Sequence, residues 1–181
     1  MAESCLSVEV QDSTPAGVPS AVLIALLAQP GGPQVILTRR AAHLRNHAAE
    51  ISLPGGRIEP SDKGPAAAAL RETWEEIGLS PEKVEILGRL KAYRTISDYC
   101  VYPFVGWVDP PVEFVCDFHE VAEVFMVPLA FVLDPANYHR DSLMYQGRRR
   151  GFYVLPYSDY RIWGATARIL VTLARTLNGT S

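Results

Sequence analysis

The alternation of apolar and polar positions along the chain predicts a structure built mainly from strands. Ser20 to Ala28 is a run of branched and aliphatic residues, the pattern of a buried strand. After a Gly- and Pro-rich cluster, Gln34 to Thr38 resumes the pattern, which predicts a hairpin. Later strands are expected over residues 84–93, 99–107, 121–127, 142–146 and 151–155, the last two flanking a turn at Gly147 to Arg150.

Two longer segments have the periodicity of helices. Pro65 to Ile77 carries one apolar face, with a proline suited to its first turn and Gly78 suited to the position after its last. Trp163 to Leu177 is a second amphipathic segment. Strands with a helix in the middle and another at the end predict an α/β (α+β) fold in which helices cover a mixed sheet. Residues 1–181 are expected to form one domain, with 1–19 as a loose arm or an edge strand.

Composition restricts the partners and the location that we expect. Hydrophobic residues make up 48% of the chain and charged residues 20%, and the net charge of −3 offers no basic field for a nucleic-acid backbone. The first residues lack the pattern of a secretory signal, and the longest apolar run, Ala21 to Ala28, is too short to span a bilayer. The three scattered cysteines are typical of reduced thiols. We therefore expect a cytoplasmic protein without nucleic-acid or membrane partners, and a homodimer stays open.

The predicted helix over Pro65 to Ile77 ends in an unusual acidic cluster. Glu72, Glu75 and Glu76 are spaced so that all three project from one side of the helix, where like charges repel. They also lie at the helix C-terminus, where the macrodipole favours cations. Arg71 offsets part of this charge, and Mg²⁺ held by carboxylates and substrate phosphates would offset the rest. The alternative interpretation is a solvated acidic face.

The run from Gly56 to Leu79 resembles the Nudix box, G-x5-E-x7-R-E-U-x-E-E-x-G-U, in which U is aliphatic. The matching positions are Gly56, Arg71, Glu72, Glu75, Glu76, Gly78 and Leu79. Asp62 stands where the first Glu is usual, with eight residues between it and Arg71, and Thr73 fills an aliphatic position. The resemblance implies a Nudix-type α/β/α sandwich and metal-dependent hydrolysis of a pyrophosphate linkage.

A second motif resembles the signature of the coenzyme A pyrophosphatase branch of Nudix enzymes. Its matching positions are Ile36 to Thr38, Arg40, Ala41, Arg45 and Pro54 to Gly56, and the segment Ile162 to Ala167 is similar to that branch as well. Ala49 and Leu53 replace a glycine and a phenylalanine of the signature. The resemblance implies cleavage of coenzyme A or its thioesters into 3′,5′-ADP and 4′-phosphopantetheine or its acyl form. Another nucleoside diphosphate derivative, such as ADP-ribose or a dinucleotide, and a non-catalytic nucleotide-binding module are the alternatives.

Four arginines near the acidic helix are candidates for holding the phosphates of such a small-molecule substrate, because a planar guanidinium binds phosphate in a bidentate manner. They are Arg39, Arg40, Arg45 and Arg57. A solvated loop that balances the glutamates is the alternative for each. Gly55 and Gly56 would let the backbone approach the metal and the phosphates.

The glutamates are the predicted ligands of Mg²⁺ or Mn²⁺. Glu72 and Glu76 are the main candidates, Glu75 would share a second ion or hold one through water, and the family resemblance adds the Gly56 carbonyl. Arg71 would orient a glutamate. Glu120, at the entrance of a predicted strand, is the candidate general base, and Glu123 is its neighbouring alternative.

Overall fold

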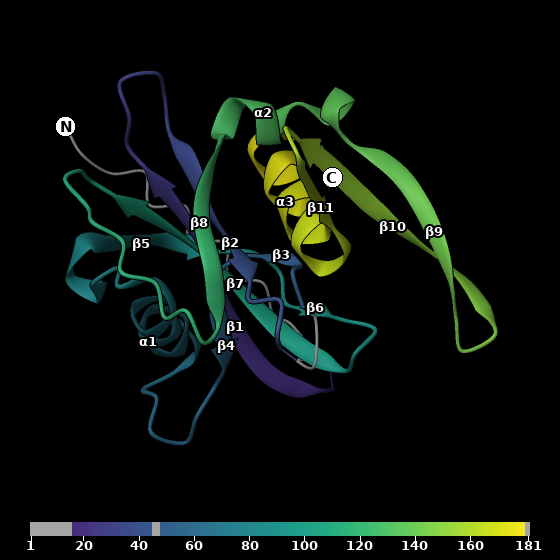
Figure 1. Ribbon diagram of the computed structural model, residues 1–181, viewed down its shortest axis with the longest axis horizontal. Helices are drawn as coiled ribbons and strands as arrows, with labels where there is room; N and C mark the ends of the chain where they lie inside the picture. Colours follow the sequence, from purple (N-terminus) through teal and green to yellow (C-terminus); the bar gives the residue numbers. More distant parts are fainter. Residues whose placement is uncertain (1–15, 45–47, 180–181) are drawn as a thin grey trace.

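A mixed sheet forms the centre of the protein. The computed structural model describes residues 16–44 and 48–179, and its large sheet has eight strands in which β3, β2, β1, β7 and β5 follow one another (Figure 1). Short β4 pairs with β1, β6 pairs with β7, and β8 pairs with β2. The strands are β1 (Val18–Leu27), β2 (Gln34–Arg40), β3 (Ile51–Ser52), β4 (Gly55–Arg57), β5 (Val84–Arg89), β6 (Tyr93–Arg94), β7 (Tyr99–Val108) and β8 (Val121–Pro128).

Helices and a small second sheet cover the two faces of the large sheet. Helix α1 (Pro65–Ile77) packs on one face, and α2 (Leu129–Leu133) and α3 (Gly164–Leu177) lie on the other, so the predicted three-layer α/β/α arrangement is confirmed (Figure 1). The second sheet has the order β11-β10-β9, and two 3₁₀ turns complete the fold. These elements are β9 (His139–Tyr145), β10 (Arg148–Tyr157), β11 (Tyr160–Trp163), η1 (Pro81–Lys83) and η2 (Pro135–Asn137).

Strand β1 is central because it is apolar on both faces. Ala21, Leu23 and Ala25 pack with α1, whereas Ile24 and Leu26 pack with α3. The strand runs parallel to β7 and antiparallel to β2 and β4, which makes the sheet mixed. A strand covered by helices on both sides needs a nearly continuous apolar run, and that run is what the sequence shows.

Helix α1 has the bounds that the sequence predicts, and the second hairpin does not. The arginines Arg148 to Arg150 lie in β10 rather than in a turn. The turn is formed by Gln146 and Gly147, whose φ angles of 48° and 72° suit a tight two-residue hairpin. Strand β9 begins earlier than predicted and β10 extends further at both ends, so both strands are longer than predicted, and Figure 1 shows the hairpin projecting from the body of the protein. At the other end of the chain, Val18 and Pro19 belong to β1, a strand inside the sheet, rather than to an arm or an edge strand, and residues 1–15 of that predicted segment lie outside the described residues.

The large sheet opens between β1 and β2, and this opening positions the glycine loop. The two strands pair only near Leu26 and Leu27, and further along β1 is joined by β4 instead. Strand β4 carries Gly55 and Gly56 and lies against α1. The acidic end of the helix therefore faces backbone that is part of the sheet.

Two further observations concern the cysteines and the length of the helices. Cys100 and Cys116 are free thiols, whereas Cys5 lies outside the described residues. In the part of the chain that the structure describes, no helix is both long enough and apolar enough to cross a membrane.

Candidate active site

The acidic cluster lies on the last two turns of α1, beside β4. Gly78 ends the helix in a left-handed conformation with φ of 71°, and its N–H donates to the Trp74 carbonyl. Glu76 is only 4% exposed, and the N–H of Gly55 donates to its Oε2 at 3.1 Å. The sharp helix end and the glycine loop thus hold one carboxylate of the cluster inside the protein.

Burial disfavours the ionised form of the Glu76 carboxyl group. It raises the pKa of Glu76 to about 8, against an ordinary value of 4.5. The Gly55 N–H and the charge of Arg40 lower this pKa in part, whereas the charges of Glu120 and Glu72 raise it further. Three carboxylates therefore act on one another electrostatically at this point.

Glu72 lies directly against the glycine loop. A side chain at Gly56 would overlap the Glu72 carboxyl group, with its Cβ 2.6 Å from Oε1. Burial raises the pKa of Glu72, and the neighbouring Arg71 opposes that shift. Glu75 is different, because its side chain is 55% exposed and its Oε2 accepts from Arg71 at 2.8 Å. Glu72 and Glu76 thus face the glycine loop, whereas Glu75 lies at the solvent-exposed edge of the acidic cluster.

Arg71 connects the helix to the loop that precedes it. Its Nε and Nη2 donate to both oxygens of Asp62, at 2.9 and 3.1 Å. Its Nη1 donates to Glu72 at 3.1 Å, and Nη2 also reaches the carbonyl of Arg57 at 3.1 Å. The Arg71 guanidinium in turn lowers the pKa of Asp62. Arg71 is therefore positioned to fix the orientation of Glu72.

The contacts of Asp62 explain why this position can be Asp rather than the Glu of the usual motif. Its side chain is 5% exposed, and besides Arg71 it accepts from the N–H of Glu59 at 2.7 Å. A short acid suffices here because the turn from Glu59 to Asp62 brings the backbone close to Arg71. The contact between Asp62 and Arg71 was not predicted from the sequence, although Asp62 stands where the motif usually has its first Glu and could have indicated it.

The four candidate arginines have different surroundings. Arg40 is half-buried, acts electrostatically on Glu76, and has a buried Nε without a hydrogen-bond partner among the described residues. Arg39 pairs with Glu123 at 2.6 Å, and Arg57 donates to the Tyr99 hydroxyl at 3.0 Å. Arg45 lies outside the described residues. Arg40 is thus the guanidinium that the structure places beside the acids.

A β-bulge separates the two candidate bases. The pairing of β2 with β8 shifts between Arg39 and Arg40, so that Arg39 opposes Glu123 and Arg40 opposes Val121. Glu123 is held by Arg39 and by a short hydrogen bond from the Tyr160 hydroxyl. The exposed Glu120 precedes the strand, and its charge acts on Glu72 and Glu76. Of the two, the structure brings Glu120 to the acidic cluster.

A cavity of about 580 Å³ opens on the side of Arg39 and Glu123. Its lining includes Tyr160, whose ring stacks on Phe125 at 3.8 Å, and Trp163. Tyr160 was not among the predicted site residues, because an aromatic residue in a strand gives no local sign that it lines a cavity. The cavity mixes aromatic rings with charged groups, as small-molecule sites do.

The acidic cluster fits a divalent metal ion, although its ligands are not yet gathered around one point. Among residues 16–44 and 48–179, no three carboxylate, imidazole or thiol groups form a finished metal site. The half-buried Glu72 and the buried Glu76 are nonetheless oxygen donors whose pKa values are raised, chiefly because burial disfavours their charged forms. A hard cation bound to their oxygens would stabilise those charged forms.

The stability of the metal-free protein is expected to fall as pH rises from 5 to 8. The pKa of Glu76 is higher in the folded protein than its ordinary value of 4.5, so the folded state binds more protons in this range. The slope from one such group is at most about 1.4 kcal/mol per pH unit. Urea denaturation in the presence of a chelator, repeated across this range, measures it, and a free energy of unfolding that rises toward pH 8 would contradict the assignment.

Ala49 occupies a backbone conformation that glycine adopts at lower cost. Its φ is 58°, in the left-handed region, where the coenzyme A signature has glycine. Ala49→Gly is expected to raise the free energy of unfolding by about 0.5–1 kcal/mol. The neighbouring Ala48→Gly is the control and should lower it, because Ala48 has no such φ. Equal destabilisation by both changes in chemical denaturation would refute the prediction.

Known proteins resemble this chain in sequence and in fold. The family profile described as the NUDIX domain matches residues 18–146. A protein named uncharacterized Nudix hydrolase NudL from Photorhabdus laumondii is 38% identical over 156 residues, 86% of this chain and 83% of that protein. A protein of the same name from Salmonella paratyphi B is 37% identical over 155 residues, 86% and 80% of the two chains. A crystal structure of a C. elegans Ap4A hydrolase binary complex has a similar fold, with a TM-score of 0.58 and 18% identity over 90% of this chain and 98% of that one.

Proposed function

This chain belongs to the Nudix family, and we propose that it hydrolyses the pyrophosphate linkage of coenzyme A or its thioesters. It is a Nudix hydrolase, and members of the family generally use Mg²⁺ or Mn²⁺. In the proposed reaction one water molecule is added across the linkage. The products are 3′,5′-ADP and 4′-phosphopantetheine, or the acyl form of the latter.

One observation carries the proposal: the buried carboxylate of Glu76 is influenced by the half-buried guanidinium of Arg40, which has an unused donor. Among the described residues, Glu76 forms no ion pair and the Nε of Arg40 has no acceptor. A metal-bound phosphate would satisfy both sides, because its oxygens accept from Arg40 while the metal binds the carboxylates. A solvated acidic face would not account for the burial of Glu76.

Each residue has a distinct part in the proposed reaction. Glu72, Glu76 and the Gly56 carbonyl would hold the metal ion, which when bound lowers the pKa of water and neutralises phosphate charge. Arg71 keeps Glu72 in place through its bonds to Asp62, and Arg40 holds a phosphate oxygen. Glu120 takes the proton of the attacking water as the P–O bond to the leaving phosphate breaks.

The choice of coenzyme A rests on the residues around the acids. Arg40 and the Gly55–Gly56 loop match the coenzyme A signature, and the cavity beside Arg39 gives room for the rest of a nucleotide. The left-handed φ of Ala49 supports the match, since glycine is the usual residue there. Hydrolysis of ADP-ribose or of a dinucleotide would use the same metal and acids, so only the substrate separates these alternatives.

The products identify the reaction directly. The protein is incubated with coenzyme A and either Mg²⁺ or Mn²⁺, and the products are separated by chromatography and identified by mass. We expect equal amounts of 3′,5′-ADP and 4′-phosphopantetheine, and none when a chelator is added. Intact coenzyme A after long incubation, with ADP-ribose cleaved under the same conditions, would reject the substrate and keep the enzyme class.

A further inference from the structure

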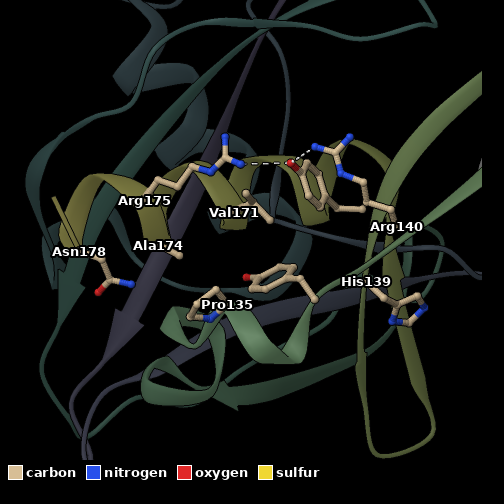
Figure 2. A pocket seen from close by; sticks show the side chains of 9 residues that line it. Pro135, His139, Arg140, Val171, Ala174, Arg175 and Asn178 are labelled. Atoms are coloured by element: carbon tan, nitrogen blue, oxygen red, sulfur yellow. Dashed lines mark hydrogen bonds between the residues drawn. The ribbon is translucent and has the colours of Figure 1, made fainter. Parts of the chain in front are cut away.

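A second recess lies on the opposite side of the sheet from the acidic cluster. It has a volume of about 320 Å³ and lies between η2, the hairpin β9–β10 and the C-terminal part of α3 (Figure 2). The acidic cluster is on α1, which packs on the other face of the large sheet. The recess contains none of the acidic residues and shares no lining residue with the cavity beside Arg39 and Glu123, so it is separate from the proposed catalytic centre.

Three guanidinium groups gather around one tyrosine at this recess. Arg140 and Arg175 both donate to the Tyr153 hydroxyl, at 2.8 and 3.2 Å, as the dashed lines in Figure 2 show. The guanidinium carbons of Arg140 and Arg168 lie 4.8 and 5.8 Å from the centre of its ring. Among the residues that the structure describes, no carboxylate forms an ion pair with any of the three arginines.

This arrangement leaves positive charge without a counterion. The Tyr153 oxygen is neutral and uses its lone pairs to accept from two arginines, so its own hydrogen is left to donate. Nearby Arg161 shows the contrast, because it is paired with Asp141 at 2.8 Å. An anion seated between Arg140 and Arg175, the two of these arginines that line the recess, would gain several charge-assisted hydrogen bonds and reduce their mutual repulsion.

The geometry points to a binding site here for the phosphomonoester group of a soluble small molecule. A phosphomonoester carries nearly two negative charges at neutral pH and three acceptor oxygens, which suits several guanidinium donors better than a carboxylate does. The lining also includes the apolar residues Val171, Ala174 and Pro135, beside the polar His139 and Asn178. The apolar surfaces would contact a short aliphatic or aromatic part of the ligand. The inference is independent of the proposed hydrolysis.

Binding can be measured without metal and without turnover. The full chain, labelled with ¹⁵N and kept in a chelator, is titrated with phenyl phosphate while its amide NMR signals are recorded. We expect saturable shifts at residues 138–140, 153 and 171–175, with a Kd on the order of 1 mM or tighter. Benzyl alcohol, the neutral probe of similar size, should produce no such shifts. Absence of saturable shifts with phenyl phosphate, or shifts confined to α1 and β4, would overturn the proposal.

Charge-matched variants distinguish binding at this recess from non-specific attraction to basic residues. The double change Arg140→Gln and Arg175→Gln should weaken phenyl phosphate binding at least tenfold, because it removes the two donors that meet at Tyr153. Arg148→Gln with Arg150→Gln removes the same charge from β10 outside the recess and should leave the Kd within twofold. Equal effects of the two double variants would refute the site. Tyr153→Phe, which keeps the ring and removes the hydroxyl, should also weaken binding, and it gives the same test if the first double variant does not fold.

A lipid headgroup could present the same phosphomonoester. Sedimentation with phosphatidylcholine vesicles, with and without phosphatidic acid, distinguishes the two sources. We expect the protein to stay in the supernatant with both vesicle types, because the recess admits a small group rather than a flat surface. Sedimentation that requires phosphatidic acid and is lost in the arginine double variant would overturn the assignment to a soluble ligand.

Discussion

Glu76→Gln is expected to reduce the rate of pyrophosphate hydrolysis at least about 100-fold at saturating Mg²⁺. The amide has nearly the shape of the carboxylate and can still accept the hydrogen bond from the Gly55 N–H. It lacks the charge that a divalent cation requires of its ligand. Initial rates of product formation, measured at several metal concentrations, test the change.

The same variant should be more stable than the wild type at pH 8 in a chelator. Burial raises the pKa of Glu76 to about 8, so ionisation is costly in the folded protein, and glutamine avoids that cost. Well below the ordinary pKa of 4.5, the two proteins should unfold alike, since the glutamate is then protonated in both states. Glu85→Gln, an exposed change of the same kind, is the control and should alter neither quantity. A stable Glu76→Gln protein with full activity would remove Glu76 from the mechanism.

Gly56→Ala is expected to abolish most activity while leaving the fold in place. A methyl group at this position would overlap the Glu72 carboxyl group, which lies at the end of a flexible side chain and can swing away. The protein therefore survives, but Glu72 leaves the place in which it faces the loop. We expect a loss of activity of at least about 100-fold, and a change in the free energy of unfolding below about 1 kcal/mol.

Gly55→Ala, in contrast, should act mainly by lowering the stability of the fold. Its φ is 144°, and a Cβ there would lie 2.6 Å from the Val22 Cα and would overlap the Ala21 carbonyl, neither of which can move without the strand. We expect a loss of stability of about 2–4 kcal/mol. Gly88→Ala has open space and an ordinary φ, so it is the matched control for both. If Gly55→Ala and Gly56→Ala reduced stability and activity to the same extent, the distinct roles given to the two glycines would be wrong.

The sequence predicts α1 accurately because the signals that define it are local. Pro65 and Gly78 mark its two ends, and the apolar stripe between them marks its buried face. The spacing of its three glutamates along one side follows from helical geometry alone. For the same reason, the presence of an acidic cluster at the end of this helix could be stated before its surroundings were known.

What surrounds the cluster depends on contacts between distant segments. The burial of Glu76 arises from β4, and its partner Gly55 is 21 residues away in the sequence. A bulge in the pairing of β2 with β8 determines whether Glu120 or Glu123 lies near the acids, and alternation along a strand does not reveal a bulge. The hairpin turn was misplaced because Gln146 adopts a positive φ, which is uncommon for its residue type.

The proposed cleavage of coenzyme A is tested most directly by comparing two substrates on one enzyme preparation. With Mg²⁺ present, kcat/KM is measured for coenzyme A and for ADP-ribose, with the appearance of 3′,5′-ADP and of AMP as the respective readouts. We predict that kcat/KM for coenzyme A is the larger by at least about tenfold. A larger kcat/KM for ADP-ribose would contradict the proposed substrate.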